Sequence, residues 1–174
     1  AGGIRDVPVA WKTRAFDFGP ETGEKTGVTV PWGVLSTAYY STGVGDIETY
    51  ATVPGPAVRA MERGRPIAPL LGVEPVKRLL TAVADRFVSG PTAAERARST
   101  SRIWGEAVSA DGERAVARLT TPDTYDLTAA TAVESARRVL AGETDPGFQT
   151  PVTAFGTDYV TGFEGVELQH VEVE

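Results

Sequence analysis

The residues from 102 to 121 read RIWGEAVSADGERAVARLTT, and this stretch decides the fold class. Two runs of strand-forming residues, Arg102 to Ser109 and Ala115 to Thr121, flank the tetrapeptide Ala110-Asp111-Gly112-Glu113. An Asp-Gly pair between two such runs is among the strongest short-range signals for a β-hairpin. We therefore predict that the two runs pair as an antiparallel hairpin.

The sequence that follows this hairpin predicts one long helix and a last strand. Asp123 or Thr124 can cap a helix, and the run from Tyr125 to Ala141 has helical periodicity before Gly142 stops it. The periodicity places four apolar residues near one face, namely Leu127, Ala130, Val133 and Leu140. The run from Val166 to Val173 is typical of a strand.

The first third of the sequence has the pattern of strands. Residues 7–11 and 28–30 alternate between apolar and polar side chains on either side of the turn-rich stretch GPETG at 19–23. Two further extended runs follow, Leu35 to Tyr40 and Ile47 to Val53. Together these runs predict an antiparallel sheet of at least four strands.

Helical patterns separate the two strand-rich parts. Residues 54–66 suit a short helix, and Pro75 to Phe87 carries one apolar stripe at helical spacing. Ala93 to Arg98 suits either a polar helical turn or a mobile loop. Because the order is not a regular alternation of strand and helix, we predict an α+β fold with a largely antiparallel or mixed sheet and helices packed mainly on one face. The 174 residues are enough for a single domain, 1–174.

Composition excludes several classes of function. The chain carries 17 Lys and Arg against 23 Asp and Glu, so its net charge of -6 disfavours nucleic acid and anionic lipid as partners. It has no cysteine and one histidine, His170, which we expect at a surface or edge position. A metal site built from Cys or paired His ligands is therefore not expected. The sequence has no apolar run long enough to cross a membrane, and we expect a cytoplasmic protein.

Hydroxyl groups cluster in the run Ser36-Thr37-Ala38-Tyr39-Tyr40-Ser41-Thr42. On a strand, alternate residues face the same side, so these hydroxyls either bind a polar substrate or decorate a solvent-facing sheet surface. The following Gly43-Val44-Gly45 lacks the third glycine of a dinucleotide fingerprint and predicts a tight turn. Asp46 and Glu48 are either a cation-binding pair or ordinary surface charge.

A second candidate is the loop Phe148-Gln149-Thr150-Pro151. Its amide and hydroxyl groups lie between Gly and Pro residues, and loops of this kind often carry binding sites. The alternative is a structural turn in which Gln149 satisfies nearby backbone groups and Phe148 fills the core.

These stretches, in this order and spacing, resemble bacterial saccharopine-dehydrogenase-like proteins. The resemblance covers nearly the whole chain and is most specific at Phe148 to Pro151 and least specific from Pro54 to Ser99. The motifs that carry it are VAWKTR at 9–14, DFG at 17–19, VPWG at 30–33, STAYYSTG at 36–43, IETY at 47–50, RIWGEA at 102–107, YDLT at 125–128, GFQTP at 147–151 and AFGTDY at 154–159.

The resemblance implies the C-terminal, substrate-side domain of an NAD(P)-dependent oxidoreductase, a dehydrogenase or reductase. In that family an N-terminal Rossmann domain binds NAD or NADP, and this part is absent from the chain, so no activity is expected from it alone and no cofactor-binding residue is assigned. The residues implied for contact with a small-molecule substrate are Tyr39, Tyr40, Ser41, Thr42, Gln149 and Thr150. Tyr40 stands where the family is expected to have histidine, so a proton donor has become a weaker acid and no catalytic residue is assigned.

Two alternatives remain open on the sequence. One is a non-catalytic dimerisation module, in which an exposed sheet pairs across a two-fold axis in a homodimer. The other is a small-molecule-binding module with an enclosed apolar cavity of its own.

Overall fold

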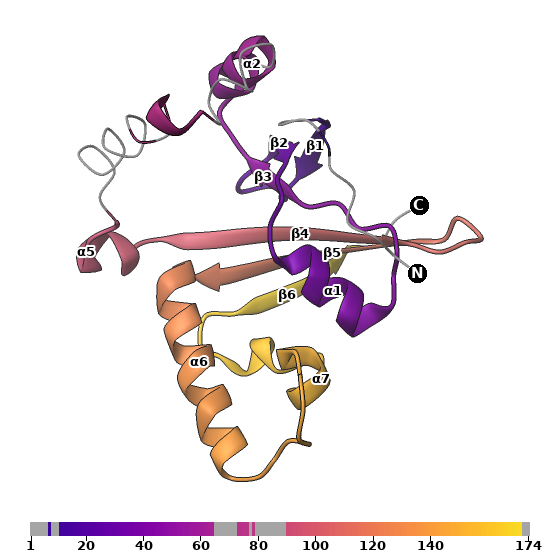
Figure 1. Ribbon diagram of the computed structural model, residues 1–174, viewed down its shortest axis with the longest axis vertical. Coiled ribbons are helices and arrows are strands. Elements are labelled where there is room, and N and C mark those ends of the chain that lie inside the picture. Colours follow the sequence, from indigo (N-terminus) through magenta and orange to yellow (C-terminus); the bar gives the residue numbers. More distant parts are fainter. Residues whose placement is uncertain (1–6, 8–10, 65–72, 77, 79–89, 172–174) are drawn as a thin grey trace. The chain divides into compact units, whose positions relative to one another are not determined.

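The computed structural model describes residues 7, 11–64, 73–76, 78 and 90–171 (Figure 1). Its internal contacts divide the chain into two compact units. The first comprises Ala1–Phe16 and Glu24–Pro91, and the second comprises Asp17–Gly23 and Thr92–Glu174. The described strands form two separate three-stranded sheets, so the strands do not join into the one large sheet that the sequence suggested.

The first sheet has the strand order β1-β2-β3. Its strands are β1 (Thr13–Asp17), β2 (Glu24–Thr29) and β3 (Tyr50–Thr52). The predicted turn at 19–23 joins β1 to β2, and β2 pairs antiparallel with β3 so that Val28 lies opposite Ala51. The strand predicted at residues 7–11 is misplaced: Val7 and Trp11 lie outside any strand, β1 begins at Thr13, and residues 8–10 lie outside the described part.

Phe16 and Val28 are the buried centre of this sheet. A Cβ atom at Gly27 would lie 2.7 Å from Cε2 of Phe16, so a glycine is needed for the Phe16 ring to approach β2. The ring meets Tyr50 edge-on, with centroids 5.0 Å apart. The helix α2 (Gly55–Gly64), which the sequence predicted as a short helix, contributes to an apolar cluster made of Val28, Val30, Val53 and Val58.

The prediction of a strand from Leu35 to Tyr40 is wrong, because these residues lie in the helix α1 (Val34–Thr42). Gly43 ends this helix with φ at +70°, a conformation that glycine adopts without a steric penalty. Gly43-Val44-Gly45 therefore follows the end of a helix and is not the tight turn between two strands that the sequence predicted. Within this helix the hydroxyls of Thr37, Ser41 and Thr42 donate to backbone carbonyls three or four residues earlier.

The second sheet has the order β4-β5-β6 and contains the predicted hairpin. β4 (Thr100–Val108) pairs antiparallel with β5 (Arg114–Pro122), which pairs antiparallel with β6 (Glu167–Val171). The Asp-Gly pair lies in the turn between β4 and β5, as predicted. The last strand is confirmed as far as Val171, and residues 172–174 lie outside the described part.

Helices of the second unit complete an α+β fold. They are α5 (Ala93–Arg96), α6 (Thr124–Leu140), α7 (Pro151–Phe155) and the 3-10 turn η2 (Val160–Gly162). α6, α7 and η2 lie on one side of the β4-β5-β6 sheet (Figure 1). The helical alternative for residues 93–98 is correct, whereas the expected helix from Pro75 to Phe87 lies largely outside the described residues. Within the described ranges, no helix has the length and apolar character needed to cross a membrane.

The packed face of α6 differs from the face that its apolar residues suggested. The side chains turned toward the rest of the unit are partly buried and mostly polar, namely Leu127, Thr131, Glu134, Ser135 and Arg138. Val133 and Leu140, which the periodicity placed with Leu127, are exposed. The reason is a set of polar contacts between this helix and the segment 155–163.

Residues Asp17–Gly23 belong to the second unit, where arginines of β4 and β5 hold them. Arg118 donates from Nε to the backbone carbonyl of Asp17 at 2.9 Å and from Nη2 to its carboxylate at 2.5 Å. Arg102 donates from Nη2 to Glu21 at 3.1 Å. The turn is therefore fixed by charged groups and not by apolar burial.

Candidate functional site

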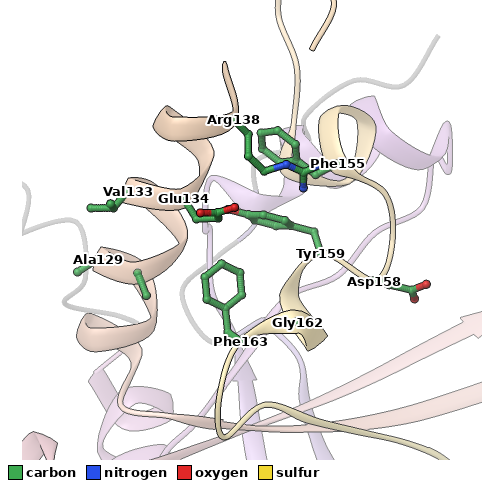
Figure 2. A pocket seen from close by; sticks show the side chains of 10 residues that line it. Ala129, Val133, Glu134, Arg138, Phe155, Asp158, Tyr159, Gly162 and Phe163 are labelled. Carbon is green, nitrogen blue, oxygen red and sulfur yellow. The ribbon is translucent and has the colours of Figure 1, made fainter. Parts of the chain in front are cut away.

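An open groove of about 870 Å³ lies between α6 and the segment that runs from α7 through η2. Figure 2 shows the side chains that form it. They are Ala129, Ala130, Val133, Glu134, Arg138, Phe155, Asp158, Tyr159, Gly162 and Phe163. All of these residues lie in the second unit, so one compact body forms the whole groove.

Three aromatic rings at a spacing of four residues line one wall. The rings of Phe155 and Tyr159 are tilted with centroids 4.7 Å apart, and those of Tyr159 and Phe163 meet edge-on at 5.3 Å. The Tyr159 hydroxyl donates to the backbone carbonyl of Thr131 at 2.8 Å and lies 2.8 Å from the Ser135 hydroxyl. These bonds fix the middle ring against α6, so the aromatic wall is held in place before any ligand arrives.

Arg138 supplies the positive charge of the groove. Its guanidinium carbon lies 4.4 Å from the centre of the Phe155 ring and 5.9 Å from that of Tyr159, within the range of cation–π attraction. Nε donates to Glu143 at 2.6 Å. A guanidinium has further donors on its Nη atoms, and among the described residues these make no hydrogen bond. Arg138 can therefore receive a carboxylate while remaining paired with Glu143.

The carboxylates of the groove are placed differently from one another. Glu134 accepts from Nε and Nη2 of Arg137, and this pairing holds the pKa of Glu134 below its ordinary value. Asp158 points away from the aromatic rings (Figure 2). The charge of Arg138 also lowers the pKa of Glu134, to a smaller extent than Arg137 does, so Arg138 has an acidic neighbour in the groove in addition to Glu143.

Four of the sequence-predicted site residues, Tyr39 to Thr42, lie in the first unit on α1. Tyr39 and Tyr40 are exposed. The hydroxyls of Ser41 and Thr42 donate to the carbonyls of Thr37 and Ala38, both at 2.8 Å. On a helix these four residues no longer alternate between two faces, and two of the hydroxyls serve the helix backbone.

The other two, Gln149 and Thr150, lie in the second unit. Gln149 is exposed beside a small polar hollow of about 250 Å³ that Glu143, Asp145 and Thr153 also line. Thr150 is buried and caps α7, because its hydroxyl accepts from the backbone N–H of Thr153 while the Thr153 hydroxyl accepts from that of Thr150. The loop thus combines a structural cap with an accessible amide. Phe148 does not fill the core as the structural alternative required, since it is 63% exposed.

A charged cluster in the first unit joins Lys12, Glu48 and Tyr50. The Lys12 ammonium pairs with Glu48, and the Tyr50 hydroxyl donates to the same carboxylate at 2.6 Å. The hydrogen bonds from Lys12 and Tyr50 hold the pKa of Glu48 below its ordinary value. Burial, followed by the bond to Glu48, raises the pKa of Tyr50 to about 12. Glu48 is therefore engaged in an ion pair, and its proposed cation-binding partnership with Asp46 has no support.

Neither unit offers a metal centre within the residues that the structure describes. No three His, Asp or Glu side chains of that part gather closely enough to hold an ion. His170 is exposed on β6, an edge strand of its sheet, as expected. In comparisons with known proteins, no family model, curated protein or solved structure matches this chain.

The groove was not among the sites predicted from the sequence. Phe155 and Tyr159 entered only as part of the AFGTDY motif at 154–159, and Arg138 was not considered. The spacing of Phe155, Tyr159 and Phe163 was no signal for it, because α7 ends at Phe155 and the three rings do not lie on one helix.

Proposed function

We propose that this chain is the substrate-side domain of a saccharopine-dehydrogenase-like NAD(P)-dependent oxidoreductase, and that the groove beside α6 receives an anionic substrate. The observation that carries the proposal is the position of Arg138 over the rings of Phe155 and Tyr159. In the sequence, the aromatic residues of this wall come shortly after Phe148 to Pro151, the segment where the resemblance is most specific. The nucleotide-binding part is then supplied by sequence outside these 174 residues.

The chemistry of the groove favours a small carboxylic acid with an apolar or flat body. Arg138 offers a guanidinium that can form directed bonds to a carboxylate, and the three rings offer apolar surface beside it. The open shape leaves room for a second body to close over the ligand. Binding energy from such a groove orients a substrate, while the redox step belongs to the cofactor.

The groove supplies binding and not proton transfer. The Tyr159 hydroxyl is already bonded to Thr131 and Ser135, and Glu134 is paired with Arg137. We therefore assign Arg138 and the aromatic wall to substrate positioning. Hydride transfer to or from a carbon bonded to nitrogen or oxygen then takes place on a nicotinamide that this chain does not itself hold.

The test uses the protein encoded together with the sequence upstream of Ala1. We expect this longer protein to bind NADPH or NADH in a fluorescence titration and the chain 1–174 to bind neither. In a screen of small carboxylic acids for nicotinamide-dependent turnover, Arg138→Gln should raise KM by about tenfold, as expected for the loss of one charged hydrogen bond, and leave nicotinamide affinity unchanged. Arg98→Gln is the matched control. Arg98 is exposed, precedes β4 in the sequence, and donates to the carbonyl of Ala94 instead of lining the groove.

Two results would overturn the proposal. One is a longer protein that binds no nicotinamide, and the other is an Arg138→Gln variant whose KM matches that of the Arg98→Gln control. If the chain 1–174 binds carboxylic acids in a calorimetric titration but the longer protein lacks nicotinamide binding, the small-molecule-binding alternative takes its place.

A further inference from the structure

The end of α6 is a Schellman motif that brings the chain back to Arg138. Gly142 has φ at +76°, the left-handed conformation that ends many helices. The Gly142 N–H donates to the carbonyl of Val139 at 3.0 Å, and the Glu143 N–H donates to the carbonyl of Arg138 at 3.1 Å. These are the two backbone bonds of this motif, and the second of them places the residue after the glycine beside Arg138. The position of Glu143 therefore follows from how the helix ends.

A further bond joins the side chains of the same two residues. Nε of Arg138 donates to the Glu143 carboxylate at 2.6 Å, and the two side chains are 27% and 40% exposed. The residues at these two positions of the motif often make an apolar contact, and a charge pair takes its place here. The backbone and side-chain bonds together fix the Glu143 carboxylate relative to the guanidinium.

The Phe155 ring and Glu143 orient the guanidinium of Arg138 together. The guanidinium carbon lies 4.4 Å from the centre of the ring, and Figure 2 shows the two groups side by side at one end of the groove. The ring holds the flat guanidinium near its face, and the bond at Nε limits rotation of the guanidinium over that face. Because this bond uses Nε, the donors of the two Nη atoms are left for a ligand.

Glu134 is a competing partner for Arg138. It precedes Arg138 by four residues, the spacing at which opposite charges on a helix pair, and it lines the same groove. In the structure Glu134 accepts from Nε and Nη2 of Arg137 instead. An Arg138 that turned to Glu134 would use its donors there and leave the Phe155 ring. The bond to Glu143 opposes that movement.

We infer that Glu143 is a positioning residue of the groove, which holds Arg138 over Phe155 and away from Glu134 so that a carboxylate ligand meets an oriented guanidinium. An arginine side chain has many rotamers, and a ligand that binds an ordered one does not have to restrict them itself. Glu143 acts through Arg138 and is assigned no contact with the ligand. The inference rests on the proposed function, because it concerns the same groove and the same anion.

Nuclear magnetic resonance of the full 174-residue chain tests the positioning without a ligand. Protons held over the face of an aromatic ring are shifted upfield, so the side-chain signals of Arg138, identified by their loss in Arg138→Gln, should show this shift. Glu143→Ala should lose the shift. Glu143→Gln should keep most of it, because its amide oxygen can accept the same bond.

Glu21→Ala is the matched control for this measurement. Glu21 pairs with Arg102 in the same unit and does not line the groove, so its loss should leave the Arg138 signals unchanged. An upfield shift that persists in full in Glu143→Ala would overturn the inference.

A titration with benzoate, a flat carboxylate, tests the consequence for binding. Glu143→Ala should raise the dissociation constant about fivefold, because the ligand must then order the Arg138 side chain itself. Glu143→Gln should recover most of this loss. If charge alone mattered, both variants would remove a negative charge near the anion and bind benzoate more tightly than the unmodified chain. Tighter binding by both variants, or an unchanged constant in Glu143→Ala, would overturn the inference.

The titration also separates this inference from the proposed function. Benzoate binding that is absent from the unmodified chain, or that Arg138→Gln leaves unchanged, would overturn the groove as an anion site, and the proposed function and this inference would fail together. Binding that needs Arg138 but is indifferent to Glu143 would overturn this inference alone.

Discussion

Tyr50 carries the one tyrosine pKa that the structure raises to about 12. Burial disfavours the phenolate, and the adjacent Glu48 carboxylate accepts the phenol proton in a hydrogen bond that the phenolate cannot donate. The folded chain therefore retains this proton at a pH where the unfolded chain has released it. The stabilisation is fully present below the ordinary tyrosine pKa near 10 and is lost as pH rises through about 12.

We predict that the free energy of unfolding falls as pH rises from 10 to about 12, and that Tyr50→Phe makes this fall shallower. Chemical denaturation at several alkaline pH values measures the slope, and the ultraviolet absorbance of tyrosinate locates the ionisation. Tyr39→Phe, in the same unit, serves as the control. An unchanged ionisation step near pH 12 in Tyr50→Phe would contradict the assignment.

The start of α6 depends on one side chain. Asp123 is 7% exposed, and its carboxylate accepts from the backbone N–H of Tyr125 at 3.0 Å. Without it, the N–H group of Tyr125 in the first turn of a 17-residue helix has no partner within the helix. α6 also forms one wall of the groove. We expect a change in its first turn to lower the stability of the fold more than it weakens binding in the groove.

Asp123→Ala should lower the free energy of unfolding by about 1 kcal/mol, within the usual range for a lost N-cap. Asp123→Asn retains an oxygen that can accept the same bond and should recover most of the loss. Urea denaturation followed by circular dichroism measures both variants. Equal loss in the Ala and Asn variants would show that the charge, and not the cap, is what matters.

Elements signalled by local chemistry were predicted from the sequence, and elements decided by tertiary contacts were not. The β4–β5 hairpin follows from its Asp-Gly turn, and α6 follows from its cap and its final glycine. The helix α1 was mistaken for a strand because its Ser, Thr and Tyr residues also occur often in strands. The usable local signal was Gly43, which ends the helix in the left-handed conformation.

The candidate site escaped sequence analysis for the same reason. Periodicity grouped Val133 and Leu140 with Leu127, but the Tyr159 hydroxyl selects the polar side of α6 through Thr131. That choice depends on a segment more than twenty residues away, which no local pattern in α6 reports. The six residues implied by the resemblance stay a prediction, whereas the groove became visible only with the fold.

At the scale of the whole molecule, each of the two units is made of segments that are not continuous in the sequence. Residues Asp17–Gly23 group with Thr92–Glu174, although both flanking segments belong to the first unit. The grouping rests on Arg118, which binds the carbonyl and carboxylate of Asp17 and is only 17% exposed. The Asp17 side chain is 63% exposed, so its carboxylate pair with Arg118 contributes little, and the main contribution comes from the bond that Arg118 Nε donates to the Asp17 carbonyl.

Arg118→Ala should therefore release the turn and lower the free energy of unfolding by about 1 to 2 kcal/mol. A protease that cleaves after glutamate should then cut at Glu21 several times faster, because the turn no longer holds one conformation. Arg114→Ala is the matched control: Arg114 lies on the same strand and pairs with Glu106 on β4, so its loss should leave cleavage at Glu21 unchanged. Equal cleavage rates in the two variants would mean that the turn is held by its own backbone bonds, such as the one from the Gly23 N–H to the Gly19 carbonyl at 2.7 Å, and not by β5.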